Sequence, residues 1–234
     1  KTMLDGISSL TYVVFLAAVI LAEWYLYKAA AFSRTVLVTI NGWLLFITLL
    51  GLTGFYHSPE AVPPRIVLLV GPPLLLLVAL FGTRNGRAFL DSLDLNLLTW
   101  MHVARFPIEL TLFWLYEAGK VPIIMTFEGR NWDILSGLTA PLIAWYAFKG
   151  NAVVRPRLLL LWNVVCLALV VNIATHGLLS AESPFQQFAF DQPNIGVLYV
   201  PFNWLPGFLV PAVIMAHLVA IRRLLHDAAT GKTG

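Results

Sequence analysis

A histidine, an arginine and a glutamate follow one another at helical spacing inside a long apolar run. His102, Arg105 and Glu109 are separated by three and four residues, so their side chains share one helix face. Charges in hydrocarbon are costly unless they pair or face a polar cavity, and they usually mark a functional site. We therefore predict a substrate-binding or proton-coupling site here. The alternative is a self-neutralised Arg105–Glu109 pair that only fixes helix packing.

Pro107 lies between the two charged residues. It has no N–H to donate to the carbonyl of Val103, so the sequence predicts a free acceptor beside the charges and a hinge in this helix.

A second histidine is predicted at the depth of the first. At about 1.5 Å per residue, His102 and His217 both lie about 10–12 Å from the inner ends of their helices. Two facing histidines could ligate a metal or a haem. They could equally be hydrogen-bonded to neighbouring side chains, so the sequence leaves the presence of a cofactor open.

A further polar set is predicted near the outer ends of the helices. Its members are Glu117, Glu128, Arg130, Asn131, Asp133, Asn172, His176 and Asn203. Carboxylates close to His176 could bind a divalent cation or act as acid and base. Glu128, Arg130, Asp133, His176 and Asn203 are therefore further candidates for substrate binding or proton coupling. In the structural alternative, Asn131 caps a helix, Asp133 complements its dipole, and Glu128 pairs with Arg130 at the rim.

The composition defines the environment in which these side chains must work. Of 234 residues, 59% are hydrophobic and only 12% are charged, whereas soluble domains carry about 25% charged residues. The surroundings must therefore be largely lipid. The net charge is +3 with its basic residues in short loops, which gives nucleic-acid binding no support. Cys166, the only cysteine, is expected to be a small buried hydrophobe.

Seven apolar segments approach the roughly 20 residues that a membrane-crossing helix needs. They are Leu10–Tyr27, Val36–Tyr56, Ile66–Gly82, Leu95–Tyr116, Trp132–Phe148, Leu158–Leu179 and Val197–Leu225. The sequence thus predicts an all-α integral membrane protein with residues 1–234 in one transmembrane domain. The third segment is short and contains Pro72-Pro73. It must nevertheless cross the membrane if the segments before and after it are to have the predicted orientations.

The distribution of lysine and arginine predicts the orientation. With the N-terminus outside, the inner side holds Lys28, Arg34, Arg84, Arg87, Lys149, Arg155, Arg157, Arg222, Arg223 and Lys232. The outer side holds Lys1, Arg65, Lys120 and Arg130, and Arg105 remains within a span. This excess of inner charges predicts a cytoplasmic C-terminus, and the plasma (inner) membrane is the expected location.

A sequence pattern that occurs twice in the chain suggests a parallel repeat. Trp24-Tyr25-Leu26-Tyr27-Lys28 recurs as Trp145-Tyr146-Ala147-Phe148-Lys149, each at the inner end of a span. Asn41 and Asn163 then occupy matching places in the next spans. Residues 10–84 and 132–223 would form two helix triplets joined by residues 95–116, a known transporter construction. This topology is similar to that of SWEET and PQ-loop transporters, but the Pro-Gln pair is missing and membership is not claimed.

One short motif points instead to an enzyme. Phe106-Pro107-Ile108-Glu109 followed by Leu112-Phe113 resembles the Pro-x-Glu segment of membrane lycopene cyclases, although Leu110 stands where a second acidic residue would follow. Three function classes therefore stay open. The first is a small-molecule or ion transporter, favoured narrowly by the possible repeat. The others are a membrane enzyme acting on a lipid or isoprenoid, with or without a metal or haem, and a structural subunit of a membrane complex.

Overall fold

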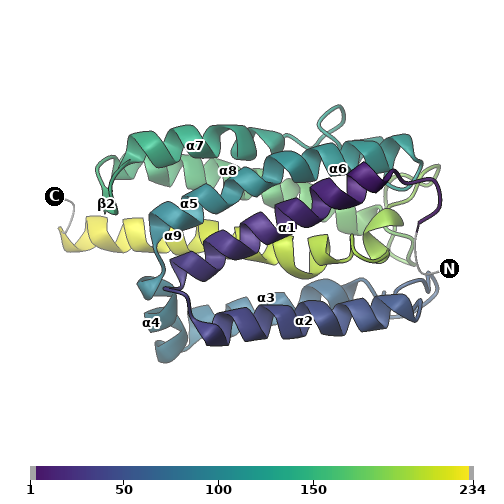
Figure 1. The fold of residues 1–234 in the computed structure, drawn as a ribbon, viewed down its shortest axis with the longest axis horizontal. Coiled ribbons are helices and arrows are strands. Elements are labelled where there is room, and N and C mark those ends of the chain that lie inside the picture. The colour runs from purple at the N-terminus through teal and green to yellow at the C-terminus, as the bar shows by residue number, and fades with distance from the viewer. Residues whose placement is uncertain (1–3, 232–234) are drawn as a thin grey trace.

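The chain folds into a bundle of helices that run along one long axis (Figure 1). The computed structural model describes residues 4–231. Its principal helices are α1 (Ser9–Ala29), α2 (Arg34–Leu52), α3 (Val67–Gly82), α4 (Arg84–Ser92), α5 (Leu95–Met101), α6 (Arg105–Glu117), α7 (Ile134–Ala147), α8 (Pro156–Leu179) and α9 (Val210–Thr230). The shorter elements are the 3-10 turns η1 (His102–Ala104), η2 (Ile123–Met125) and η3 (Gly196–Leu198), the π-helical turn η4 (Leu205–Leu209), and the two-stranded hairpin of β1 (Phe148–Lys149) and β2 (Ala152–Val153).

The helices fit a membrane-embedded protein. Within the described residues, α1, α2, α8 and the continuous run Leu205–Thr230 are each long and apolar enough to cross a bilayer, and α3 with α4 qualifies as one bent pair. This gives four to five candidate spans. The count of seven and the orientation remain predictions, and Lys1, Lys232 and Gly234, on which the orientation partly depends, lie outside the described residues.

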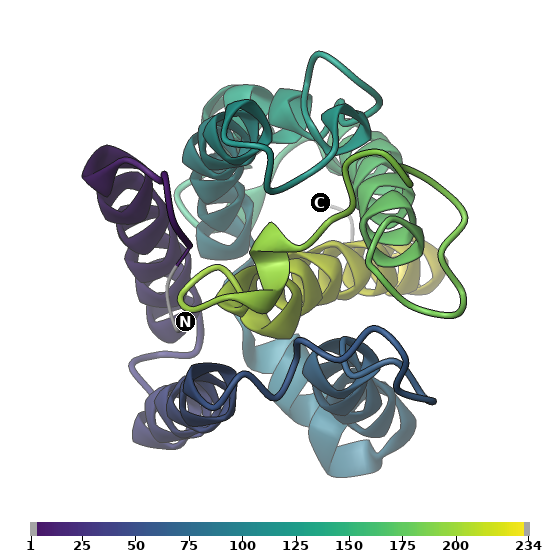
Figure 2. The same ribbon diagram turned by 90° about the vertical axis from the view of Figure 1, so that its right-hand side faces the viewer.

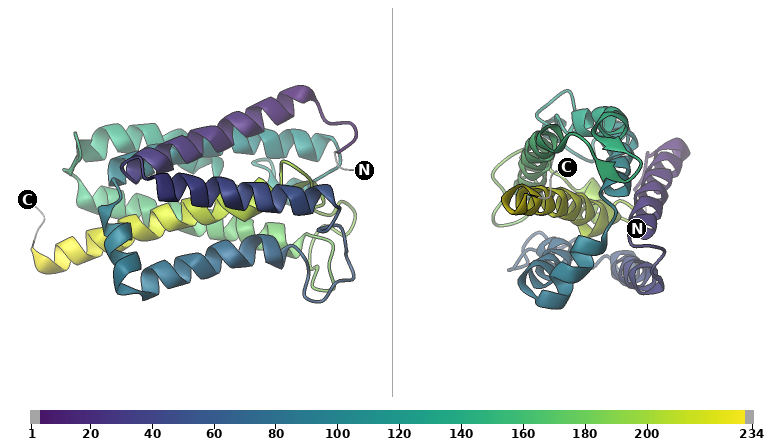
Figure 3. Two further views of the ribbon diagram at one scale, coloured as in Figure 1. Left: turned by 60° about the horizontal axis from the view of Figure 1, so that its bottom comes forward. Right: turned by 90° about the vertical axis from the view of Figure 1, so that its left-hand side faces the viewer.

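The segment between the third and fourth predicted spans forms the helix α4. It follows α3 after a bend of 97° (Figure 3). A Cβ on Gly86 would lie 2.4 Å from the carbonyl oxygen of Leu80, so the bend depends on glycine at this position. Arg222 of α9 forms an ion pair with Asp91, which ties the C-terminal part of α9 to α4.

The fourth predicted span is interrupted where its polar residues lie. The α-helix α5 gives way to the 3-10 turn η1, and the α-helical conformation begins again at Arg105. Pro107 therefore occupies the first turn of α6, where its missing N–H breaks no helical hydrogen bond. The expected hinge at Pro107 is thus replaced by a 3-10 turn that precedes it.

The last predicted span begins in the 3-10 turn η3, continues as irregular chain, and becomes continuously helical only near η4. Because Pro211 has no N–H, it cannot donate to the carbonyl of Gly207, four residues earlier. The indole Nε1 of Trp43 in α2 donates to that carbonyl at 2.8 Å instead. The break in the helix is therefore stabilised by a neighbouring helix, as broken segments in membranes require.

The packing around this last segment gives the predicted repeat no support. The most extensive helix contact is between α8 and α9, whereas α1 packs mainly on α5 and α6. Figure 2 shows α9 between the α2–α3 pair and the remaining helices. The paired positions also differ, because Asn41 is exposed beside Glu23 while Asn163 is buried beside His217.

Candidate functional site: a buried polar cluster beside an apolar cavity

The site forms where α7 approaches η1 and the start of α6. A Cβ built on Gly137 would lie only 2.6 Å from the backbone nitrogen of Phe106. The absence of a side chain at Gly137 therefore permits this close contact. It brings the residues before α7 against the charged face of α6.

Arg105 forms a buried ion pair with Asp133. Its Nε donates to Asp133 Oδ2 at 2.7 Å, and its Nη2 also contacts that oxygen. Ser136 donates to the other carboxylate oxygen at 3.2 Å. The self-neutralised pair predicted from the sequence was assigned the wrong acid, because the partner of Arg105 lies on another element rather than at Glu109. The side chains of Arg105 and Asp133 are only 5% and 7% exposed, so removal of either would leave a charge stranded.

The other end of Arg105 meets His217 of α9. Arg105 Nη1 lies 3.0 Å from His217 Nε2. A guanidinium has only donors, so Nε2 must be the acceptor and the ring hydrogen must be on Nδ1. His217 Nδ1 lies 2.8 Å from Asn163 Oδ1, which accepts that hydrogen. The amide of Asn163 then donates to the carbonyl of Leu159. This chain of donors and acceptors makes His217 a neutral side chain of defined tautomer.

His102 and His217 do meet, but not as metal ligands. Their rings are stacked with centroids 4.0 Å apart and an interplanar angle of 14°, against Trp162. A ligating lone pair lies in the plane of its ring, so stacked rings cannot direct two nitrogens at a shared ion. His217 Nε2 is also occupied by Arg105. Within residues 4–231 no group of three or more His, Cys, Asp or Glu is arranged to hold a metal. The stacked arrangement of this pair therefore gives the suggested metal or haem ligation no support.

Glu109 is held by an amide rather than by a cation. Asn131 Nδ2 donates to Glu109 Oε2 at 2.6 Å and to the carbonyl of Met125 at 3.0 Å, while Asn131 Oδ1 accepts from the backbone of Asp133. Glu109 is 2% exposed and Asn131 is fully buried. Among the described residues Glu109 forms no ion pair. The cluster thus holds one guanidinium and two carboxyl groups.

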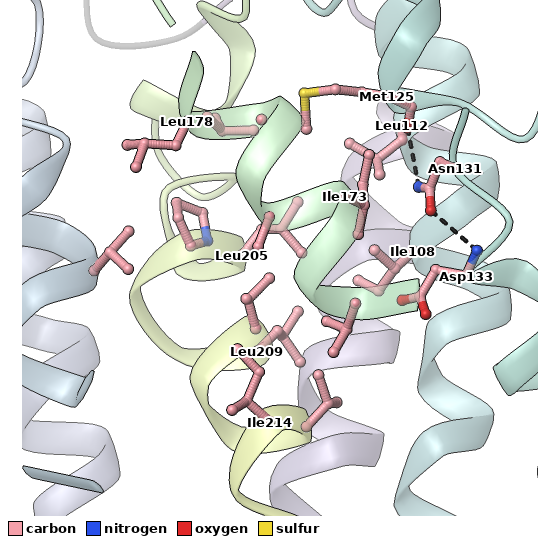
Figure 4. Close-up of a pocket in the computed structure, with 18 of the residues that line it drawn as sticks. Ile108, Leu112, Met125, Asn131, Asp133, Ile173, Leu178, Leu205, Leu209 and Ile214 are labelled. Atoms are coloured by element: carbon pink, nitrogen blue, oxygen red, sulfur yellow. Dashed lines mark hydrogen bonds between the residues drawn. The ribbon is translucent and has the colours of Figure 1, made fainter. Parts of the chain in front are cut away.

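A cavity of about 280 Å³ extends from this cluster into the apolar interior. Arg105, Glu109, Asn131 and Asp133 form its polar wall. The rest of the lining is mainly aliphatic, with Ile108, Leu112, Ile173, Leu209 and Val213 among its residues. Figure 4 shows Asn131 and Asp133 at one side of this space and Leu178 at the other, with α8 and the η4–α9 segment between them.

The cavity reaches the surface of the bundle between α3 and α8. Leu74 of α3 and Val171, Thr175 and Leu178 of α8 line it and are exposed. These residues surround the broken segment η4, whose Leu205 and Pro206 also line the cavity. A molecule dissolved in the bilayer could therefore enter from the side.

The remaining candidates from the sequence lie apart from this cluster. Glu128 and Arg130 are exposed on the segment before α7. His176 is half-buried, packs on Phe188, and has its Nδ1 2.9 Å from the backbone carbonyl of Asn172. Asn203 is fully buried and donates to the carbonyl of Ile47 at 2.9 Å, which ties the last segment to α2. The structure thus separates the predicted outer set and leaves Asn131 and Asp133 with the fourth-span residues.

Three side chains of the cluster escaped the sequence analysis as site residues. The sequence predicts Asn131 as a member of the outer polar set or a helix cap and Asn163 as one half of a repeat, and it gives no prediction for Trp162. A buried amide inside an apolar helix was the available signal for Asn163, because such a group must find a partner. For Asn131, the available signal was its position two residues before the candidate Asp133, which places the two side chains near each other.

Comparisons with protein-family models, with curated proteins and with solved structures found no match to this chain.

Proposed function

We propose that this chain is a membrane-embedded enzyme that takes a lipid or an isoprenoid into the cavity and exchanges a proton with it at Glu109. The observation that carries the proposal is the joining of an apolar cavity to two buried carboxyl groups. Binding sites for small molecules are mostly apolar, with a few placed polar groups that fix orientation. A carboxyl group within reach of the bound molecule supplies general acid or base chemistry.

The two carboxyl groups have different roles in this proposal. Asp133 forms an ion pair with Arg105, and the pair sets a fixed electrostatic field at the polar wall. Glu109 has only the amide of Asn131 as its partner, so it is the group free to gain or lose a proton. Two acids in different environments are a recurrent arrangement for acid–base chemistry.

Occupancy of the cavity is tested with matched tryptophan variants on α8. Ala174 lines the cavity, whereas Ala168 on the same helix is exposed and is not among its lining residues. Native mass spectrometry of the purified full chain should detect a co-purified lipophile in the wild type and in Ala168→Trp. Ala174→Trp should lose it. Equal retention in both variants would refute binding in this cavity.

Proton transfer is tested by isotope exchange. The reconstituted protein is incubated in D2O with the non-saponifiable lipid fraction of a bacterial membrane, and deuterium in carbon–hydrogen positions is measured by mass spectrometry. Glu109→Gln should lower the incorporation about 100-fold or more, the usual contribution of a general acid or base. Glu117→Gln, an exposed position on the same helix, should leave it unchanged. Incorporation that survives Glu109→Gln would exclude Glu109 as the proton-transfer group.

Transport of the same lipophile is the second candidate, and the break at η4 favours it. A π-turn followed by Pro211 beside the cavity provides a place where the last helix can bend. Transport predicts that the molecule is bound and released unchanged, without deuterium incorporation. An ion as cargo fits less well, because most of the cavity wall is aliphatic.

The proposal includes seven crossings with the N-terminus outside. The contiguous run of α5, η1 and α6 supplies the fourth crossing, α3 supplies the third, and α7 supplies the fifth. The excess of Lys and Arg on one side supports this orientation.

A further inference from the structure

The polar lining of the cavity has spare hydrogen-bond acceptors, whereas its donors largely have partners. Six polar side chains line it: Arg105, Glu109, Asn131, Asp133, Thr175 and Asn194. Each of these side chains has donors or acceptors, and those that have no partner inside the protein remain for a ligand. That remaining capacity determines which chemical end of a molecule the site can accept.

Most of the donors are engaged inside the protein. The exception is Arg105 Nη2, which lies against Asp133 Oδ2 as an ion-pair contact and makes no hydrogen bond. Both hydrogens of the Asn131 amide go to Glu109 and to the carbonyl of Met125. The hydroxyl of Thr175 donates to the carbonyl of Val171 at 2.8 Å. Arg105 bonds to Asp133 and His217, and its positive charge is matched by Asp133. An anion at this wall would therefore add a negative charge that no free cation neutralises.

The acceptors are in excess. Asn194 lines the cavity, is 1% exposed, and its Oδ1 has no partner in the described part of the chain. Its orientation is determined because Nδ2 donates to the carbonyl of Gly177 at 2.9 Å. A buried acceptor without a partner is costly, so a ligand donor would stabilise it. Glu109 and Asp133 add carboxyl oxygens to the same lining.

We propose that the cavity selects a lipophile whose polar end donates hydrogen bonds, a long-chain alcohol or amine, and rejects the same chain ending in a carboxylate or phosphate. This inference rests on the proposed function for the location of the ligand, and it specifies the class of ligand. An ammonium group donates to more than one of the acceptors on Glu109, Asp133 and Asn194, and a hydroxyl donates to one of them. The chain lies along the aliphatic wall toward the opening between α3 and α8.

The test uses three photoreactive probes with one diazirine-bearing alkyl chain that ends in an alcohol, an amine or a carboxylate. The full-length protein is reconstituted in phosphatidylcholine vesicles, illuminated with each probe, and the labelled residues are mapped by mass spectrometry. The alcohol, the amine or both should label the cavity at least about tenfold more than the carboxylate, because like-charge contact is strongly unfavourable. Labelling by the alcohol alone or by the amine alone identifies the source of the donor.

Three variants make the result decisive. Ala174→Trp should abolish cavity labelling by the preferred probe, and Ala168→Trp should not. Asn194→Leu should lower that labelling. Asn172→Leu should not, because Asn172 is an amide in α8 that does not line the cavity. Equal or stronger labelling by the carboxylate would overturn the selection of donor-headed lipophiles and leave the proposed function standing. If no probe labels the cavity, both the selection and the proposed function are wrong.

Discussion

Arg105 donates from Nη1 to Nε2 of His217 at 3.0 Å, and this contact assigns the tautomer of a histidine at the centre of the bundle. The ring hydrogen must lie on Nδ1, where Asn163 accepts it. Arg105 is thereby held from two sides, by Asp133 at one edge and by His217 at the other. It is a rigid part of the site wall rather than a mobile charge carrier.

The hydrogen bonds of His217 predict a specific loss of stability. His217→Phe keeps a planar ring but leaves a donor of Arg105 and the Oδ1 of Asn163 without partners. We expect it to lower the free energy of unfolding by about 2–4 kcal/mol, since each unsatisfied buried polar group costs about 1–3 kcal/mol. Chemical denaturation in detergent measures the change. His226→Phe, at an exposed position on the same helix, should change the stability by less than about 0.5 kcal/mol.

The chain contains a buried and an exposed arginine–aspartate pair, which provide a matched comparison. Asp133→Asn strands the charge of Arg105 and should destabilise the protein by about 3–5 kcal/mol. Asp91→Asn breaks the partly exposed pair with Arg222 and should cost about 1 kcal/mol or less. The double variant Arg105→Leu with Asp133→Leu should recover much of the first loss. Similar costs for the two single variants would show that the Arg105–Asp133 pair is hydrated.

The orientation is tested by labelling in intact cells. In a Cys166→Ala background, Gln187→Cys should react with an impermeant maleimide, because Gln187 is exposed in the connection after α8. Asn85→Cys, exposed in α4, should react only after the membrane is permeabilised. The opposite pattern would invert the predicted topology.

A histidine beyond the end of α2 predicts a loss of stability in mild acid. Burial, the largest cause, lowers the pKa of His57 from its usual value of 6.5. The unfolded state therefore binds the proton more readily than the folded state. The stability that depends on neutral His57 is present above pH 6.5 and is lost as the pH falls through the lowered pKa. The drop in melting temperature between pH 7.5 and pH 5 should be smaller in His57→Phe than in the wild type, and an unchanged drop would contradict this assignment.

The sequence by itself determined that the chain is helical, with apolar helices that fit a membrane protein. Long apolar runs with few charges can satisfy their backbone groups in lipid only as helices, and this depends on composition alone. It also identified His102, Arg105 and Glu109 as neighbours, because helical spacing is a local property. The depth estimate for His217 was close enough to suggest that it meets His102, as the stacked rings show.

Only the tertiary structure decided the partners of these residues. Arg105 had an acid at helical spacing, yet it pairs with Asp133, because Gly137 lets α7 approach η1 closely. The cavity was likewise not predictable, since its walls are aliphatic residues indistinguishable in the sequence from those that face lipid. Side-chain pairing between helices depends on their rotation and distance, which apolar periodicity in a membrane leaves undetermined because both the interior and the solvent are apolar.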